Sequence, residues 1–247
     1  MYSRIISLVP SQTELLSYLG LEKEVIGITK FCVHPAEWFK NKTRVGGTKN
    51  INFEIIHQLS PDLIIANKEE NEQEQIEKLA ENYNVYITDV NDLNDAINMI
   101  NAIGKLTERM KPASALASGV NVSFKKIGNI VFAREKIRAA YFIWKDPFMV
   151  AGGYTFINDM MNYCGLENIF SVKKRYPQIA LEEIKELDCE LILLSSEPFP
   201  FKKKHKEEME KIFPGIKIIL VDGEMFSWYG SRLLKSAEYF ENFLMKR

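Results

Sequence analysis

The chain has 247 residues, which is enough for one large domain or for two smaller units that each bury a core. Hydrophobic residues make up 46% of it and charged residues 26%, and the formal net charge is −1. This balance argues against a nucleic-acid partner or an anionic membrane surface as the partner. Because the sequence contains no run of 18 apolar residues, we expect no membrane-spanning helix.

Short runs of apolar and β-branched residues alternate with helical patterns along the whole chain. The runs in the first half are residues 4–9, 25–29, 62–67 and 84–90. Those in the second half are residues 138–144, 190–195 and 217–223, with a weaker one at 167–172. Near-continuous apolar strands separated by amphipathic segments are typical of parallel sheets covered by helices. The sequence therefore predicts an α/β fold.

The two halves of the chain resemble each other. Residues 18–27 (YLGLEKEVIG) parallel residues 163–171 (YCGLENIFS), and residues 53–70 parallel residues 181–198. This duplication predicts two similar lobes, each with its own parallel sheet. The first half carries additional residues at about 31–47 and the second at about 146–153. Both insertions follow strands, on the side where open α/β sheets bind ligands.

Residues 92–132 form a long helical pattern between the two halves. Asp92 and Asp95 lie at its start, and Pro112 divides it at a position suited to the first turn of a new helix. The second piece has an apolar stripe at helical spacing: Leu116, Val120, Phe124, Ile127 and Val131. We therefore expect an N-terminal lobe at 1–91, a connecting helix at 92–132 and a C-terminal lobe at 133–247.

The stretch FCVHP, residues 31–35, places a thiol and an imidazole close together within the first insertion. Three interpretations are open: a metal-binding pair, a nucleophile with its base, or an ordinary loop. The local sequence supplies neither further metal ligands nor an acid that would orient His34. We assign Cys32 to packing and expect His34 to contact a ligand.

Further candidates lie at the starts of two predicted helices in the first half. Ser11 and Glu14 have the spacing of a capping box, and the same helix start could face a ligand. The acidic stretch at 67–74 is either a solvated helix start or part of a binding site. Glu69 and Glu70 lie nearest the strand end and are the acids best placed for a ligand.

Aromatic and charged residues follow three strands of the second half. Because they are interleaved with proline, glycine and charge, we interpret them as lining a concave site for a large flat ligand. Arg232 could pair with a ligand carboxylate or with Glu224. We expect His57 and His205 on the surface. With one remaining site histidine, the sequence does not predict a closed structural zinc site.

The residues that follow the predicted strands make up the complete set of expected ligand contacts. In the first half they are Ser11, His34, Thr48, Glu69 and Glu70. In the second half they are Trp144, Tyr154, Glu197, Trp228, Tyr229 and Arg232.

Three segments carry a resemblance to a known family: RIISLVPSQTELLSYLG (residues 4–20), VGGTKNINFEIIHQLSPDLIIANKEEN (45–71) and MVAGGYTFINDMMNYCGLENIF (149–170). They resemble the helical-backbone, or class III, substrate-binding proteins of ABC importers. That class includes the vitamin B12, haem and ferric-siderophore binders. The resemblance implies a non-enzymatic protein that captures a corrinoid, haem or ferric siderophore in an interlobe cleft, without a required cofactor. It also implies that exposed acids dock onto a permease, and the acids in matching regions are Glu72, Glu74, Glu207 and Glu208.

Two other functions remain open from the sequence. A cytoplasmic carrier or sensor of the same ligand would use the same fold, and an enzyme could act through Cys32 and His34. The chain as given has no leader, which predicts a cytoplasmic location; a periplasmic or surface-tethered location is expected if a leader has been removed. We expect a monomer. His34 is also a candidate axial ligand for the metal of a bound chelate.

Overall fold

The computed structural model describes residues 2–245 and divides them into two compact units. Among the described residues, unit 1 comprises residues 2–90, 94–120 and 229–233, and unit 2 comprises residues 91–93, 121–228 and 234–245. The units divide the predicted connecting segment between them, and unit 1 takes in a short segment from near the C-terminus. The three-part division at 91/92 and 132/133 stays a prediction.

Unit 1 is built on a five-stranded parallel sheet in the order β3-β2-β1-β4-β5. Its strands are β1 (Ile5–Ser7), β2 (Val25–Ile28), β3 (Thr43–Arg44), β4 (Leu63–Asn67) and β5 (Val85–Thr88). Its helices in this part of the chain are α1 (Pro10–Tyr18), α2 (Ala36–Asn41), α3 (Phe53–Leu59) and α4 (Gln73–Ala80). In register, Ile5 of β1 lies opposite Leu63 of β4.

The core of unit 1 forms where apolar side chains of the strands meet α3 and α4. Ile6 and Ile64 on the sheet pack with Ile56 of α3 and Ile76 of α4. Helix α3 begins at its N-cap Asn52, whose side chain accepts a hydrogen bond from the backbone N–H of Ile55 at 3.0 Å. Asparagine satisfies a backbone donor that the first helical turn leaves open.

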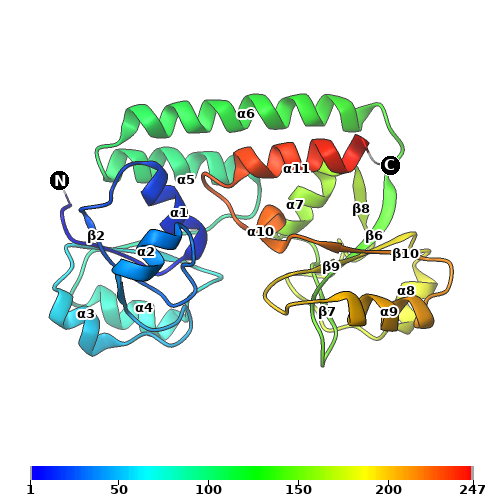
Figure 1. The fold of residues 1–247 in the computed structure, drawn as a ribbon, viewed down its shortest axis with the longest axis horizontal. Coiled ribbons are helices and arrows are strands. Elements are labelled where there is room, and N and C mark those ends of the chain that lie inside the picture. The colour runs from blue at the N-terminus through cyan, green and yellow to red at the C-terminus, as the bar shows by residue number, and fades with distance from the viewer. Residues whose placement is uncertain (1, 246–247) are drawn as a thin grey trace. The chain divides into compact units, whose positions relative to one another are not determined.

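Unit 2 has a sheet in the order β10-β9-β6-β7, with β8 also paired to β6 (Figure 1). Its strands are β6 (Ile137–Trp144), β7 (Met149–Val150), β8 (Leu166–Asn168), β9 (Leu191–Ser195) and β10 (Lys217–Val221). Its helices are α7 (Phe156–Tyr163), α8 (Glu182–Glu186), α9 (Lys203–Ile212), α10 (Gly223–Ser227) and α11 (Leu233–Met245). Among the described strands of this sheet, β7 alone pairs antiparallel with its neighbour, β6, and the other pairs are parallel.

The two faces of the unit 2 sheet bury alternate residues of β6. Phe142 belongs to a core cluster with Ile184 of α8 and Met209 of α9. Tyr141, next in sequence, points to the other face, where its ring lies 5.0 Å from Phe226 of α10. Alternation with a period of two is the geometry of a strand buried on both faces.

The predicted duplication is confirmed by the topology. The order β2-β1-β4-β5 in one sheet corresponds to β8-β6-β9-β10 in the other. Between the first and last strands of each series, the elements without a counterpart are α2 and β3 in unit 1 and β7 in unit 2. They arise from the insertions at about 31–47 and 146–153 that the sequence comparison identified.

The predicted helical connection is also confirmed. It consists of α5 (Leu93–Leu106) and α6 (Met110–Phe132), and the boundary between them lies just before Pro112. The apolar stripe predicted for α6 is buried along its length, including Leu116 and Phe124. None of the helices in residues 2–245 is long and apolar enough to cross a membrane.

Candidate functional site

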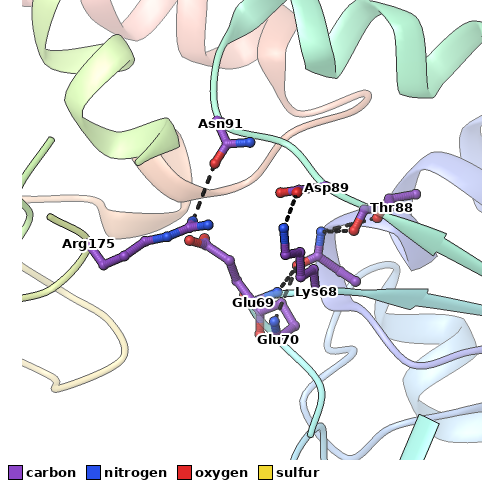
Figure 2. Close-up of polar contacts among 8 residues, drawn as sticks. Lys68, Glu69, Glu70, Thr88, Asp89, Asn91 and Arg175 are labelled. Carbon is purple, nitrogen blue, oxygen red and sulfur yellow. Dashed lines mark hydrogen bonds and ion pairs between the residues drawn. The ribbon is translucent and has the colours of Figure 1, made fainter. Parts of the chain in front are cut away.

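A buried polar network organises the carboxyl ends of β4 and β5 in unit 1. The Asn67 side chain donates to the backbone oxygen of Thr88 at 3.0 Å and to its hydroxyl at 3.1 Å. Its Oδ1 atom accepts from the backbone N–H groups of Glu69 and Glu70, at 2.9 and 3.2 Å. Figure 2 shows these two glutamates on the loop after β4, with Thr88 nearby. The network fixes the backbone that carries Glu69, which is half-buried, and Glu70, which is exposed.

The same network reaches Thr48. The Asn71 side chain donates to the Thr48 backbone oxygen at 2.9 Å and accepts from the Asn67 N–H at 2.9 Å. Thr48 is buried. The role of Thr48 as a ligand contact stays a prediction. The sequence did not single out Asn67 and Asn71, although two asparagines flanking the acidic stretch are a signal for side chains that hold a loop.

The start of α1 is not capped as the sequence suggested. The N-cap is Val9 and makes no side-chain cap bond, and Pro10 occupies the first turn. A capping box needs Ser11 at the N-cap and Glu14 at the third helical position, but the helix begins one residue earlier and Ser11 lies within its first turn. The capping-box interpretation is therefore wrong. Ser11 is buried in this first turn.

Arg232 pairs with Glu14, a partner that the sequence did not indicate. The Nε atom of Arg232 donates to Oε2 of Glu14 at 2.9 Å, inside unit 1. Arg232 is 5% exposed. The preceding Gly230 has φ +103 and approaches Leu15 closely, since a Cβ built there would meet Leu15 Cβ at 3.2 Å. The segment 229–233 thereby packs on α1.

Cys32 is a packed residue, as predicted. It is fully buried, and its sulfur lies 3.0 Å from the Thr13 hydroxyl and 3.1 Å from the Thr29 hydroxyl. Burial raises the pKa of the Cys32 thiol, which keeps it protonated near neutral pH. His34 lies two residues further on and is half-buried. The peptide bond between His34 and Pro35 is cis.

Lys68 and Asp89 form an exposed ion pair beside the same loop. Their Nζ and Oδ2 atoms are 2.7 Å apart (Figure 2). Since both side chains are solvated, this pair contributes little to stability. It places one positive and one negative charge at the carboxyl ends of β4 and β5.

Glu197 is the centre of the polar cluster in unit 2. Its Oε1 atom accepts from the Ser227 hydroxyl at 2.5 Å and from the indole N–H of Trp228 at 2.9 Å. Burial raises the pKa of the Glu197 carboxyl, and the nearby Glu224 raises it further, whereas the hydrogen bond from Ser227 lowers it. The cluster brings together two predicted site residues, Glu197 and Trp228, from the loop after β9 and the end of α10.

The predicted aromatic contacts differ in accessibility. Trp144, at the end of β6, is 39% exposed, and its ring meets Phe199 edge to face at 5.8 Å. Tyr154 is 69% exposed. Trp228 and Tyr229, by contrast, are buried, in unit 2 and unit 1 respectively. The two groups therefore have different surroundings: the first offers ring surface to solvent, and the second packs inside the protein.

The two other histidines were both expected on the surface, and this is correct for His57 only. His57 is exposed and lies 3.2 Å from the Tyr83 hydroxyl. His205 is buried, because its ring packs between Phe199 and Phe201. Its Nδ1 atom accepts the backbone N–H of Lys202 at 3.0 Å, and burial lowers its pKa. The lysines around His205 in the run FKKKHK had indicated a surface position.

The four acids predicted to dock on a permease all lie on the surface of their own unit. Glu72 and Glu74 are exposed at the start of α4, and Glu207 and Glu208 are exposed on α9. Glu208 forms an ion pair with Lys145, and that ion pair lowers the pKa of the Glu208 carboxyl. Within residues 2–245, no three His, Cys, Asp or Glu side chains are grouped so that they could hold a metal ion.

The two α/β units share one topology and carry polar side chains at the carboxyl ends of their parallel strands, which is the arrangement of the class III, two-unit α/β fold. The family model described as periplasmic binding protein matches residues 5–213. The chain belongs to that family and is a substrate-binding protein, not an enzyme. The alternative of an enzyme acting at Cys32 and His34 is therefore wrong.

Three known proteins illustrate the similarity. A vitamin B12-binding protein of Pectobacterium atrosepticum is 27% identical over 244 residues, covering 95% of this chain and 86% of that protein. A possible iron-binding periplasmic solute-binding protein of Staphylococcus epidermidis is 26% identical with a TM-score of 0.82, covering 98% of both chains. The periplasmic haem-binding protein of Roseiflexus sp. RS-1 is 18% identical with a TM-score of 0.84, covering 99% of both chains.

Proposed function

We propose that this chain captures a metal chelate, namely a corrinoid, haem or ferric siderophore, and presents it to the permease of an ABC importer. The observation that carries the proposal is the match to vitamin B12-binding relatives along nearly the whole chain, 95% of it in the case described above. A match of this extent includes both units and the loops at the carboxyl ends of their strands. The ligand itself brings the metal, and the protein needs no resident cofactor.

The accessible members of the predicted site are proposed as the ligand contacts. In unit 1 these are His34, Glu69 and Glu70, and in unit 2 Trp144, Tyr154 and Glu197. Rings such as that of Trp144 offer flat apolar surface, and carboxylates and imidazole offer hydrogen bonds or metal ligation. These are the chemical features that a large, flat and partly polar chelate requires.

The buried members are proposed to support those contacts. Trp228 donates to Glu197 and so holds the carboxyl group, and Arg232 holds α1 through Glu14. The other three buried members are Ser11, Thr48 and Tyr229. Because their side chains lie inside the protein, substitutions there should change both stability and binding, whereas substitutions of the exposed residues Glu70, Trp144 and Tyr154 should change binding alone.

Absorbance titration with haem and with cyanocobalamin tests the role of His34. If His34 ligates the metal of the bound chelate, His34→Ala changes the absorbance spectrum of the complex and weakens binding. If His34 only hydrogen-bonds the ligand, binding weakens with an unchanged spectrum. His57→Ala is the matched control, since His57 is exposed and lies outside the proposed contacts. Equal behaviour of the two variants would remove His34 from the site.

The exposed acids are proposed to bind basic residues of the permease. Reversing charge at Glu74 in unit 1 and Glu207 in unit 2 should lower ligand uptake by cells without changing the affinity of the purified protein for ligand. Charge reversal at Glu54, an exposed acid in α3, is the control. Uptake that depends equally on all three acids would contradict a specific docking role.

A further inference from the structure

A basic loop follows the carboxyl end of β8 in unit 2. It contains Lys173, Lys174 and Arg175 in succession. Backbone hydrogen bonds tie it to the segment after β7: Gly152 N donates to Arg175 O at 2.7 Å, and Gly153 N donates to Lys173 O at 2.7 Å. In return, the Arg175 N–H donates to Gly153 O at 3.0 Å. The loop is therefore held in one backbone conformation by bonds that do not involve its side chains.

Two successive glycines make this close approach possible. A Cβ atom at Gly152 would lie 2.3 Å from the Lys173 oxygen, and one at Gly153 would lie 2.0 Å from the Ser171 oxygen. Both distances are far inside van der Waals contact, and both involve backbone, which cannot easily move away. The two glycines of the sequence MVAGGYT thus allow the basic loop to pack closely against this segment. The packing fixes the backbone from which the basic side chains extend.

The three cations of the loop differ in their surroundings. Lys173 forms an ion pair with Glu183, which neutralises its charge. Arg175 donates from Nη1 to Asn91 Oδ1 at 3.3 Å, as Figure 2 shows. Lys174 is exposed, and across the described residues it takes part in no ion pair. Its positive charge is thus not compensated by an acid of its own unit.

Lys174 lies over an aromatic ring. Its Nζ atom is 5.9 Å from the ring centroid of Tyr154, a cation–π contact. The Tyr154 backbone has φ +59, a left-handed conformation that is costly for a residue with a large side chain. Tyr154 is 69% exposed, so packing of its side chain in the core does not offset the cost of this conformation.

We propose that Tyr154 and Lys174 form an anion subsite that binds a carboxylate, phosphate or catecholate oxygen of the ligand. The ammonium group supplies the charge, the tyrosine hydroxyl a hydrogen bond, and the ring an apolar surface for the attached group. This inference rests on the proposed function and narrows it, because it selects a chelate with net negative charge over a neutral corrinoid.

Equilibrium binding to two pairs of probes tests the charge preference. Haem is compared with its dimethyl ester, which has the same ring without the two carboxylates. An anionic ferric tricatecholate is compared with a neutral ferric trihydroxamate, and cyanocobalamin is added as a neutral corrinoid. The proposal predicts that the protein prefers the anionic member of a pair, and that its affinity falls as salt is raised because screening weakens charge attraction.

Three variants of the whole chain identify the residue responsible. Lys174→Gln removes the charge and should weaken binding of the anionic probe about tenfold, whereas Lys174→Arg keeps the charge and should retain most of the affinity. Lys125→Gln, at an exposed lysine of α6, is the control for a charge loss elsewhere on unit 2. The loop's backbone hydrogen bonds remain in each variant, so thermal unfolding should be unchanged and loss of binding cannot come from loss of fold.

The outcomes separate this inference from the proposed function. Binding of a neutral probe only, or equal binding by Lys174→Gln and the unsubstituted chain, would overturn the anion subsite and leave the proposed function in place. Binding of no chelate at all would overturn both. Preference for the anionic probe, lost in Lys174→Gln and kept in Lys174→Arg and Lys125→Gln, is the result expected.

Discussion

The ion pair between Glu14 and Arg232 should be one of the single contacts that stabilise unit 1 most. Its Nε–Oε2 distance of 2.9 Å corresponds to a gross attraction of about 6 kcal/mol at an effective dielectric constant of about 20. The cost of desolvating both groups offsets much of this attraction. Removing one partner leaves the other charge buried, because the Arg232 and Glu14 side chains are only 6% and 16% exposed.

Arg232→Met should therefore lower the free energy of unfolding by about 3 kcal/mol, and Glu14→Gln by a similar amount. The double variant should cost less than the sum, with a coupling energy of about 2 kcal/mol. If the whole chain unfolds in one transition, its unfolding entropy is about 0.5 kcal/mol/K, so about 3 kcal/mol lowers Tm by about 6 °C.

Urea unfolding of the four members of this double-mutant cycle measures the coupling. The exposed pair between Lys126 and Glu241, with N–O distance 2.6 Å, is the matched control, and its cycle should give less than about 1 kcal/mol. If the buried pair couples no more strongly than the exposed one, the structural role assigned to the segment 229–233 is refuted.

Three further predictions concern a glycine, an acid and the thiols. Gly153→Ala should destabilise the protein by about 2 kcal/mol or more, measured by thermal unfolding, because its Cβ would lie 2.0 Å from the Ser171 oxygen; an unchanged Tm would mean that the loop moves freely. Glu197 has a raised pKa, so its folded form holds a proton more tightly than its unfolded form, and its contribution to stability falls as pH rises from its usual pKa through the raised one. In urea unfolding, Glu197→Gln should consequently gain stability relative to the unsubstituted chain as the pH rises above the usual pKa of a glutamate, and a constant difference would contradict the raised pKa. Cys32 and the two other cysteines are buried, so a thiol reagent should label none of them until the protein is unfolded; rapid labelling of the folded protein would show that the loop at Cys32 opens.

Much of the fold could be predicted from the sequence because its strands are almost purely apolar. Near-continuous apolar runs such as residues 62–67 and 190–195 indicate central strands of a sheet that is covered on both faces. The duplicated segments then set the order of elements in both units. The very short strands β3 and β7 were missed, since two residues leave no pattern to detect.

The candidate site was harder to predict because it depends on pairings between residues far apart in sequence. Arg232 lies 218 positions from Glu14, and nothing local distinguishes that partner from the nearer Glu224. His205 was hidden by the lysines around it, although its spacing to Met209 places it on the buried face of α9. Lys174 could not be singled out from the sequence, because its cation–π contact with Tyr154 and the close packing of its loop on Gly152 and Gly153 arise only in the folded chain.

Native mass spectrometry of the folded chain mixed with haem, cyanocobalamin and a ferric siderophore tests the central claim most directly. The account predicts that one class of chelate is retained as a one-to-one complex and is recovered chemically unchanged after the complex is denatured. Failure to retain any of these chelates, or release of a chemically altered product, would contradict a substrate-binding protein for metal chelates.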